Sequence, residues 1–109
     1  MPAAKDHLHG TLDALILKTL TFGPRHGYSI VRWLREQTND SLRVEEGSLY
    51  PALYRMERDG WISADWGTSE LGRNAKFYSI TEKGRRRLRD ETKEFATFVA
   101  AVSPLLLPG

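Results

Sequence analysis

The side chains best suited to bind another molecule are tyrosines and arginines spaced along residues 48–58. At helical spacing Tyr50, Tyr54, Arg55 and Arg58 share one face of a helix. The opposite, apolar face consists of Leu49, Ala52, Leu53 and Met56. Phenol hydroxyls and guanidinium groups donate hydrogen bonds to phosphate oxygens, and the guanidinium fork also matches O6 and N7 of guanine. The pattern therefore predicts a helix whose outer face binds a nucleic acid.

The four side chains are expected to differ in role. Tyr50 is predicted to donate to a phosphate, which fixes position without reading sequence. Arg55 is the candidate for reading a base, although a solvated or phosphate-bound arginine fits the pattern equally well. Tyr50 and Tyr54 both have the alternative of a half-buried aromatic at the edge of the core, which fits Tyr54 better than Tyr50. Arg58 has the alternative of stabilising the C-terminal end of the helix dipole.

This helix is bounded by recognisable start and stop signals. Ser48 is predicted to cap its first turn, Pro51 to sit where a missing N–H costs nothing, and Gly60 to provide a left-handed exit. Further along the chain, residues 73–89 carry seven basic side chains against one acid. A basic run is often only a solvated helix face, but beside residues 48–58 it favours contact with a polyanion.

The remaining segments supply the elements that must position that helix. We expect a first helix that ends before Gly23-Pro24, a second helix from Gly27 to about residue 37, and a short strand at 42–44 before the third helix. Strands at 61–66 and 75–80 are expected to follow the third helix, and a last helix is expected from Thr81 to about Val102. Residues 67–74 form the hairpin tip. The predicted organisation is a flexible arm at 1–9, a domain at 10–80, a C-terminal helix at 81–103 and a tail at 104–109, with Ser103-Pro104 ending the last helix.

The last helix carries an apolar seam that needs a cover. Its members recur at alternating steps of four and three and are Leu88, Thr92, Phe95, Val99 and Val102, with Phe98 and Leu88 adding a second edge. A chain of 109 residues has little spare core, so a second copy of the chain is the simplest cover, assisted by Leu8 and Leu12 of the first helix. The alternative is that the seam packs on its own domain.

Composition excludes several other classes of protein. The chain has no cysteine, so it is neither a disulfide scaffold nor a cysteine-based zinc protein, and we expect a cytoplasmic location with no membrane segment. His7 and His9 lack a third ligand, and His26 fits a capping or surface residue better than a switch. We therefore predict no metal site, no cofactor, no catalytic residue and no enzyme activity. Trp33, Trp61 and Trp66 fit core or edge aromatics better than a ligand pocket.

The order helix, helix, short strand, helix, hairpin, helix is that of a winged helix-turn-helix, a mainly α fold with a small β-hairpin (α+β), here with a long C-terminal dimerisation helix. Within that order the chain resembles the PadR-type transcriptional regulators. The resemblance is carried by Leu15 to Leu20, His26-Gly27-Tyr28, Gly47 to Leu53, Glu57 to Ile62, and Arg73 to Thr81 followed by Gly84.

The resemblance implies a homodimeric bacterial repressor that binds an inverted repeat in double-stranded DNA and is released by a small-molecule inducer or by changes in its own abundance. It implies that Ser48, Tyr50 and Pro51 lie at the DNA surface, with Arg73, Asn74 and Lys76 nearby on the wing. Because a fold does not fix a partner, a winged helix used only for protein contacts is the alternative function.

Overall fold

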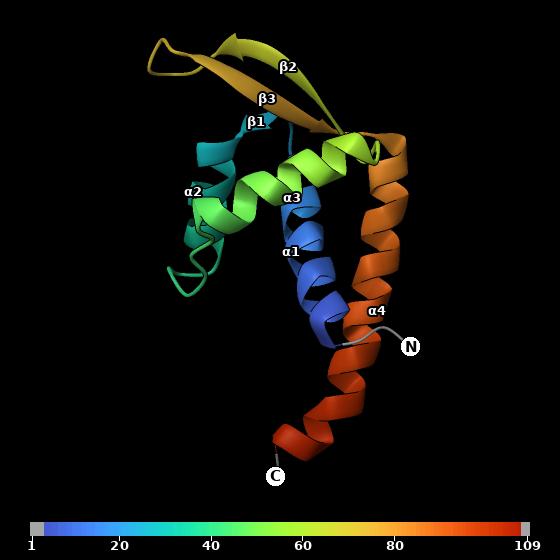
Figure 1. Cartoon of the computed structure of the whole chain (residues 1–109). Helices are drawn as coiled ribbons and strands as arrows, with labels where there is room; N and C mark the ends of the chain where they lie inside the picture. The colour runs from blue at the N-terminus through green and yellow to red at the C-terminus, as the bar shows by residue number, and fades with distance from the viewer. Residues whose placement is uncertain (1–3, 108–109) are drawn as a thin grey trace.

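The protein is a four-helix domain with a hairpin that projects beyond the helices (Figure 1). The computed structural model describes the backbone of residues 4–107 and the side chains of residues 10–107. In chain order the elements are α1 (Ala4–Leu20), β1 (Arg25–His26), α2 (Gly27–Gln37), α3 (Glu46–Arg58), β2 (Ile62–Thr68), β3 (Asn74–Ile80) and α4 (Glu82–Leu106). The predicted α+β fold class and order of helices are confirmed.

The core lies where α1, α2 and α3 meet beneath the sheet. Its buried side chains are Ile16, Leu17, Leu20, Ile30, Leu34, Leu49, Ala52, Leu53, Met56, Ile62 and Tyr78. The apolar face predicted for α3 is therefore confirmed. Burying this face fixes the rotation of α3 about its axis, so the opposite face has to point away from the domain.

The sheet has three antiparallel strands in the order β1-β3-β2. The strand predicted at 42–44 is wrong, because these residues pair with no strand and belong to no helix. Arg25 and His26 take the place beside β3, opposite Tyr78 and Phe77, so both edges of β3 are already paired. A local β-prone run cannot form a strand without an available edge.

Two predicted boundaries also change. Helix α1 begins at Ala4, so residues 4–9 of the predicted arm are helical, and α4 continues past Ser103 to Leu106. Pro104 does not end α4, because a proline removes only its own N–H from the helix, while Leu107 N–H still donates to the Ser103 carbonyl at 2.8 Å. The capping of α4 by Thr81 is confirmed, since its hydroxyl oxygen accepts from the Gly84 N–H at 3.0 Å.

The start of α4 is tied to the end of α3. The Thr81 hydroxyl donates to the Gly60 carbonyl at 2.7 Å, and the Thr81 N–H donates to the Trp61 carbonyl at 3.1 Å. Gly60 has φ +81°, so the predicted left-handed exit from α3 is confirmed. From this junction α4 runs alongside α1 and then beyond it (Figure 1).

Candidate nucleic-acid interface

Helix α3 starts earlier than its sequence pattern suggested. Its N-cap is Glu45, whose side chain makes no capping hydrogen bond, and Ser48 lies inside the first turn, where its N–H donates to the Glu45 carbonyl at 3.0 Å. The prediction that Ser48 caps the helix is therefore wrong. Pro51 lies one turn into α3, where its missing N–H deprives the Gly47 carbonyl of its usual donor, so its position costs one backbone bond.

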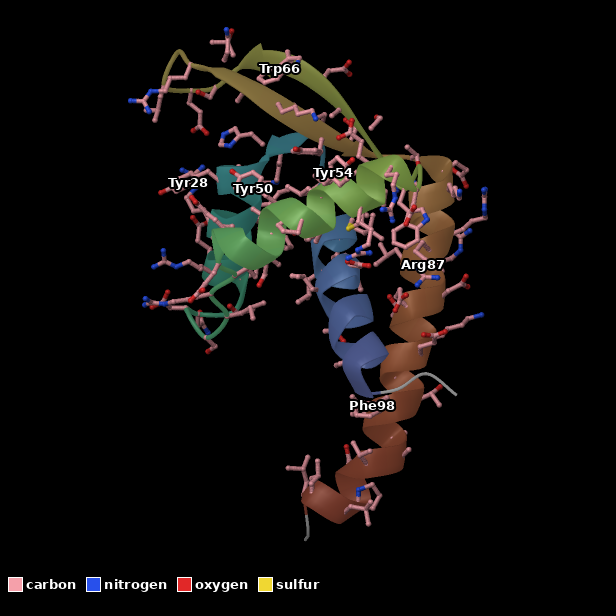
Figure 2. The ribbon with its side chains drawn as sticks, viewed as in Figure 1. Tyr28, Tyr50, Tyr54, Trp66, Arg87 and Phe98 are labelled. Atoms are coloured by element: carbon pink, nitrogen blue, oxygen red, sulfur yellow. The ribbon has the colours of Figure 1, made fainter. Side chains whose placement is uncertain are left out.

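The outer face of α3 is open along its whole length. Among the predicted side chains, Ser48, Tyr50, Pro51, Tyr54 and Arg58 are all exposed. Tyr54 keeps 71% of its surface in solvent, which excludes the half-buried alternative. Figure 2 shows Tyr50 and Tyr54 in sequence along this face.

Tyr50 leans toward α2 while remaining accessible. A Cβ atom built on Gly27 would lie 2.8 Å from the Tyr50 hydroxyl oxygen, so only glycine at position 27 lets the ring approach this closely. The phenol thereby points into the space between α3, α2 and the hairpin. From that place its hydroxyl can donate to a bound group without leaving the helix surface.

Arg55 does not belong to this open face. Its two terminal nitrogens donate to the two carboxylate oxygens of Asp13 on α1 at 2.9 and 2.8 Å, and the Asp13 side chain is only 3% exposed. The hydrogen bonds that Arg55 donates to Asp13 raise the pKa of Arg55. Because breaking this pair would leave a buried carboxylate unpaired, the structure corrects the prediction that Arg55 reads a base.

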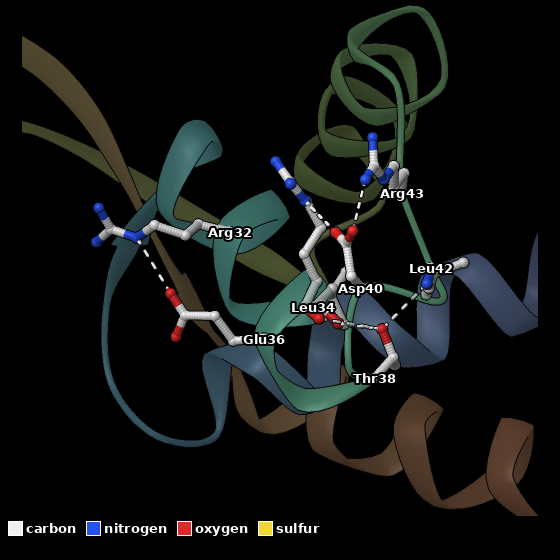
Figure 3. Close-up of polar contacts among 8 residues, drawn as sticks. Arg32, Leu34, Glu36, Thr38, Asp40, Leu42 and Arg43 are labelled. Atoms are coloured by element: carbon white, nitrogen blue, oxygen red, sulfur yellow. Dashed lines mark hydrogen bonds and ion pairs between the residues drawn. The ribbon is translucent and has the colours of Figure 1, made fainter.

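The turn between α2 and α3 is fixed by short polar contacts (Figure 3). The Thr38 hydroxyl donates to the Leu34 carbonyl at 2.7 Å and accepts from the Leu42 N–H at 3.1 Å. Asp40, at φ 65°, receives hydrogen bonds from Arg43 and Arg35, which hold the pKa of its carboxyl below the ordinary value. These contacts set the direction in which α3 leaves the turn.

The hairpin brings its predicted residues to the same side of the domain. Arg73 and Asn74 are exposed near its tip, and Lys76 lies nearer the helices. Lys76 forms an ion pair, because its ammonium donates to the Glu57 carboxylate of α3 at 3.1 Å. This hydrogen bond raises the pKa of Lys76. The hairpin and α3 are therefore linked by charge.

A cavity of about 750 Å³ lies between the hairpin and the helices. Besides Tyr50, Arg73, Asn74 and Lys76, it is lined by Tyr28 and Arg32 of α2 and by Trp66 of β2. The sequence patterns did not assign these three to the site. Tyr28 and Trp66 are 65% and 74% exposed, which is unusual for large aromatics. Figure 2 shows Tyr28 beside α2 and Trp66 on the hairpin.

His26 is a capping residue, as expected. Its Nδ1 accepts the Ser29 N–H at 3.2 Å at the start of α2, and its ring stands edge-on to Phe77 of β3. Trp33 and Trp61 pack against the core, whereas Trp66 does not. The expectation for the tryptophans is therefore right for the first two, while the third lines the cavity.

The basic run divides between two environments. Lys83, Arg85, Arg86 and Arg89 lie on α4, and all four are exposed. Arg87 turns inward, where its guanidinium lies 4.7 Å from the Trp61 ring centre and pairs with Glu91. Burial raises the pKa of the Glu91 carboxyl, which packs against Gly10 of α1.

The residues predicted for the dimer seam also divide. Leu12 and Leu88 pack partly against the core of their own domain, which is the kind of contact that the self-packing alternative describes, and Leu88 also lines the groove between α1 and α4. Thr92, Phe95, Phe98 and Val99 are exposed, Val102 is half-buried, and the side chain of Leu8 lies outside the described residues. Thr92 and Phe95 line an apolar groove of about 560 Å³ between α1 and α4.

Two kinds of site are missing from the part of the chain that the structure describes. That part of the chain contains no helix with the length and hydropathy needed to cross a bilayer. Among residues 10–107, whose side chains the structure describes, no three histidine, aspartate or glutamate side chains gather closely enough to hold a metal ion.

An exposed third helix, a fixed turn before it and a projecting hairpin beside it define the winged-helix class of transcriptional regulators. Over residues 16–90 the chain matches the Transcriptional regulator PadR-like family. It belongs to that family, whose members are transcriptional regulators and not enzymes.

Individual relatives resemble the chain over nearly its whole length. Uncharacterized protein X of Lysinibacillus sphaericus is 34% identical over 95% of this chain and 94% of its own. A transcriptional regulator from Clostridium thermocellum superposes with a TM-score of 0.80 at 28% identity, covering 89% of this chain and 94% of its own. A PadR-like regulator from Bacillus cereus gives a TM-score of 0.74 at 30% identity, covering 95% and 99%.

Proposed function

We propose that the protein regulates transcription by binding an inverted repeat in double-stranded DNA as a homodimer, in the cytoplasm, with α3 in the major groove and the hairpin on the flanking backbone. The observation that carries this is the open face of α3 made by Ser48, Tyr50, Pro51 and Tyr54, beside the wing residues Arg73 and Asn74. A major groove about 12 Å wide admits one helix, and α3 is the helix that the fold leaves exposed for it.

The contacts on this face favour positioning over base reading. Tyrosine and serine hydroxyls suit phosphate oxygens, while Arg55, the arginine predicted to read guanine, is held by Asp13. Repression would follow from occupying a promoter, and the dimer would place two copies of α3 in successive major grooves roughly 34–36 Å apart.

A salt titration tests DNA binding without knowledge of the operator. Fluorescence anisotropy on a mixed-sequence duplex should show log affinity falling linearly with log salt, because each neutralised phosphate releases counterions. Replacing both Arg73 and Lys76 by alanine should remove about two units of slope.

An unchanged slope in this double variant would mean that the hairpin never reaches the DNA backbone. Absence of any salt-dependent binding by the wild-type chain would overturn the proposal and favour a module for protein contacts.

Tyr50→Phe and Ser48→Ala should weaken binding to operator and unrelated duplexes by similar factors, because hydroxyl contacts to phosphate carry no sequence information. Anisotropy on the DNA upstream of the coding gene and on a scrambled copy measures both affinities. A loss confined to the operator would instead assign base reading to these residues.

A further inference from the structure

A single acid lies in the cavity between the hairpin and the helices. Its lining includes three cationic side chains, Arg32, Arg73 and Lys76, and Glu70 is the one acidic residue among the described residues that line it. Tyr28 and Tyr50 add phenol hydroxyls to the same wall. The lining is thus rich in groups that bind an anion, and the anion now present is the Glu70 carboxylate.

Glu70 reaches from the hairpin tip to α2. Its Oε1 lies 3.6 Å from Nη2 of Arg32 and 3.7 Å from Nε2 of His26. One carboxylate oxygen therefore lies between a donor on α2, Arg32, and a donor on β1, His26, which is the position that a phosphate oxygen would take.

These contacts are easily exchanged. Both distances exceed those of a hydrogen bond, and the side chains of Glu70 and Arg32 are 67% and 46% exposed. Exposed ion pairs of this kind contribute little to stability. Nothing in the packing of the described residues requires the carboxylate to stay.

The hairpin tip does not depend on the Glu70 side chain. Its backbone is closed by the Ser69 N–H donating to the Arg73 carbonyl and the Gly72 N–H donating to the Ser69 carbonyl, both at 2.8 Å, with Gly72 at φ +74°. A phosphate could therefore displace the carboxylate without unfolding the tip.

We propose that Arg32 and His26 form a phosphate-binding site for the DNA backbone, and that Glu70 fills this site in the unbound protein until a phosphate replaces it. The inference rests on the proposed DNA binding and adds to it a site on α2 and an acid that competes with DNA. Glu70 then weakens binding to every duplex and does so through Arg32.

The competing role predicts a gain of affinity when the acid is neutralised. Glu70→Gln should bind a mixed-sequence duplex about fivefold more tightly. The wild-type protein has to break the exposed ion pair between Glu70 and Arg32 when DNA binds, and the variant has no such pair to break. Asp65→Asn is the matched control. Asp65 is an exposed acid on the same hairpin, one residue from the cavity-lining Trp66 and thus on the opposite face of β2, so this variant should change affinity less than about twofold.

A double-variant cycle tests whether Arg32 is the group involved. Arg32→Gln should lower the slope of log affinity against log salt by about 0.9. In the Arg32→Gln background, Glu70→Gln should give no more gain than Asp65→Asn. Thermal unfolding of each variant, followed by circular dichroism, confirms that the domain is intact.

The outcomes separate this inference from the proposed function. Suppose that the wild-type chain binds duplex with a steep salt dependence. If Glu70→Gln then changes affinity no more than Asp65→Asn, or if it raises affinity equally in the Arg32→Gln background, the proposed phosphate site is wrong and DNA binding stands. If the wild-type chain binds no duplex even at low salt, both proposals fail.

Discussion

Two arginines three residues apart on α3 show how a partner decides the role of a side chain. Arg55 faces α1 and holds the buried Asp13, whereas the Arg58 side chain is 61% exposed and pairs with the neighbouring Asp59 at 3.3 Å. Their sequence contexts are similar, and both lie in the last turn of the helix. Arg55 is held in the ion pair with Asp13, and Arg58 remains available to a ligand.

The first prediction follows from this difference. Arg55→Ala should lower the free energy of unfolding by about 3 kcal/mol, because it strands the Asp13 carboxylate in the interior. Arg58→Ala, the matched control, should change it by less than about 1 kcal/mol. Urea unfolding followed by circular dichroism measures both. If Arg55→Ala leaves stability unchanged and weakens only operator binding, the base-reading role is restored.

A second residue-scale prediction concerns pH. Hydrogen bonds from Arg43 and Arg35 lower the pKa of Asp40 below 3.8 in the folded protein. The ionised Asp40 carboxylate therefore stabilises the folded protein fully above pH 3.8, and this stabilisation disappears as the pH falls through the lower pKa of the folded state. Asp40→Asn, which tolerates the same positive φ, should lower the Tm at about pH 7, and the difference from wild type should shrink below about pH 3.8. A constant difference would mean that the carboxylate charge is irrelevant.

Among the helices and strands, the features that depend on residues close in sequence were predicted correctly from the sequence pattern. The spacing of Leu49, Leu53 and Met56 identified the buried face of α3, and the β-prone runs around residues 67–74 identified the hairpin. Contacts between distant residues escaped prediction. The Asp13 partner of Arg55 lies 42 residues earlier, and pairing of the two-residue β1 with β3 depends on an edge that only the assembled sheet provides.

Two helical glycines should respond in opposite ways to alanine. A Cβ on Gly84 would overlap the backbone carbonyl of Trp61, whereas one on Gly47 would meet nothing within 4 Å. Gly84→Ala should destabilise the domain by about 1–3 kcal/mol, because α4 must move away from the end of α3, and this exceeds the helix propensity gained. Gly47→Ala should be neutral or stabilising by up to about 1 kcal/mol. Urea unfolding measures both, and equal effects would contradict the close approach at Gly84.

The molecule as a whole is elongated because α4 is long. The domain measures 51 × 29 × 23 Å, because the second half of α4 extends beyond α1 (Figure 1). This extension leaves Phe95 and Val99 49% and 38% exposed, beside an apolar groove between α1 and α4. Exposed apolar surface of this kind usually marks an interface. A second copy offers a matching helix and groove, which is why we propose a two-fold dimer.

The last prediction tests that dimer. Replacing Phe95 and Val99 by aspartate should split it, because unpaired charges are costly to bury, and should weaken operator binding because a monomer reaches only half of an inverted repeat. Thr97→Asp with Ala101→Asp is the matched control. It adds the same charge to exposed positions on the opposite side of α4 and should leave the dimer intact. Sedimentation equilibrium measures the mass, and anisotropy on the same samples measures operator affinity. A Phe95 and Val99 variant that stays dimeric at micromolar concentration would move the interface elsewhere. A monomeric variant that still binds the operator tightly would separate recognition from dimerisation and remove the basis for the inverted repeat.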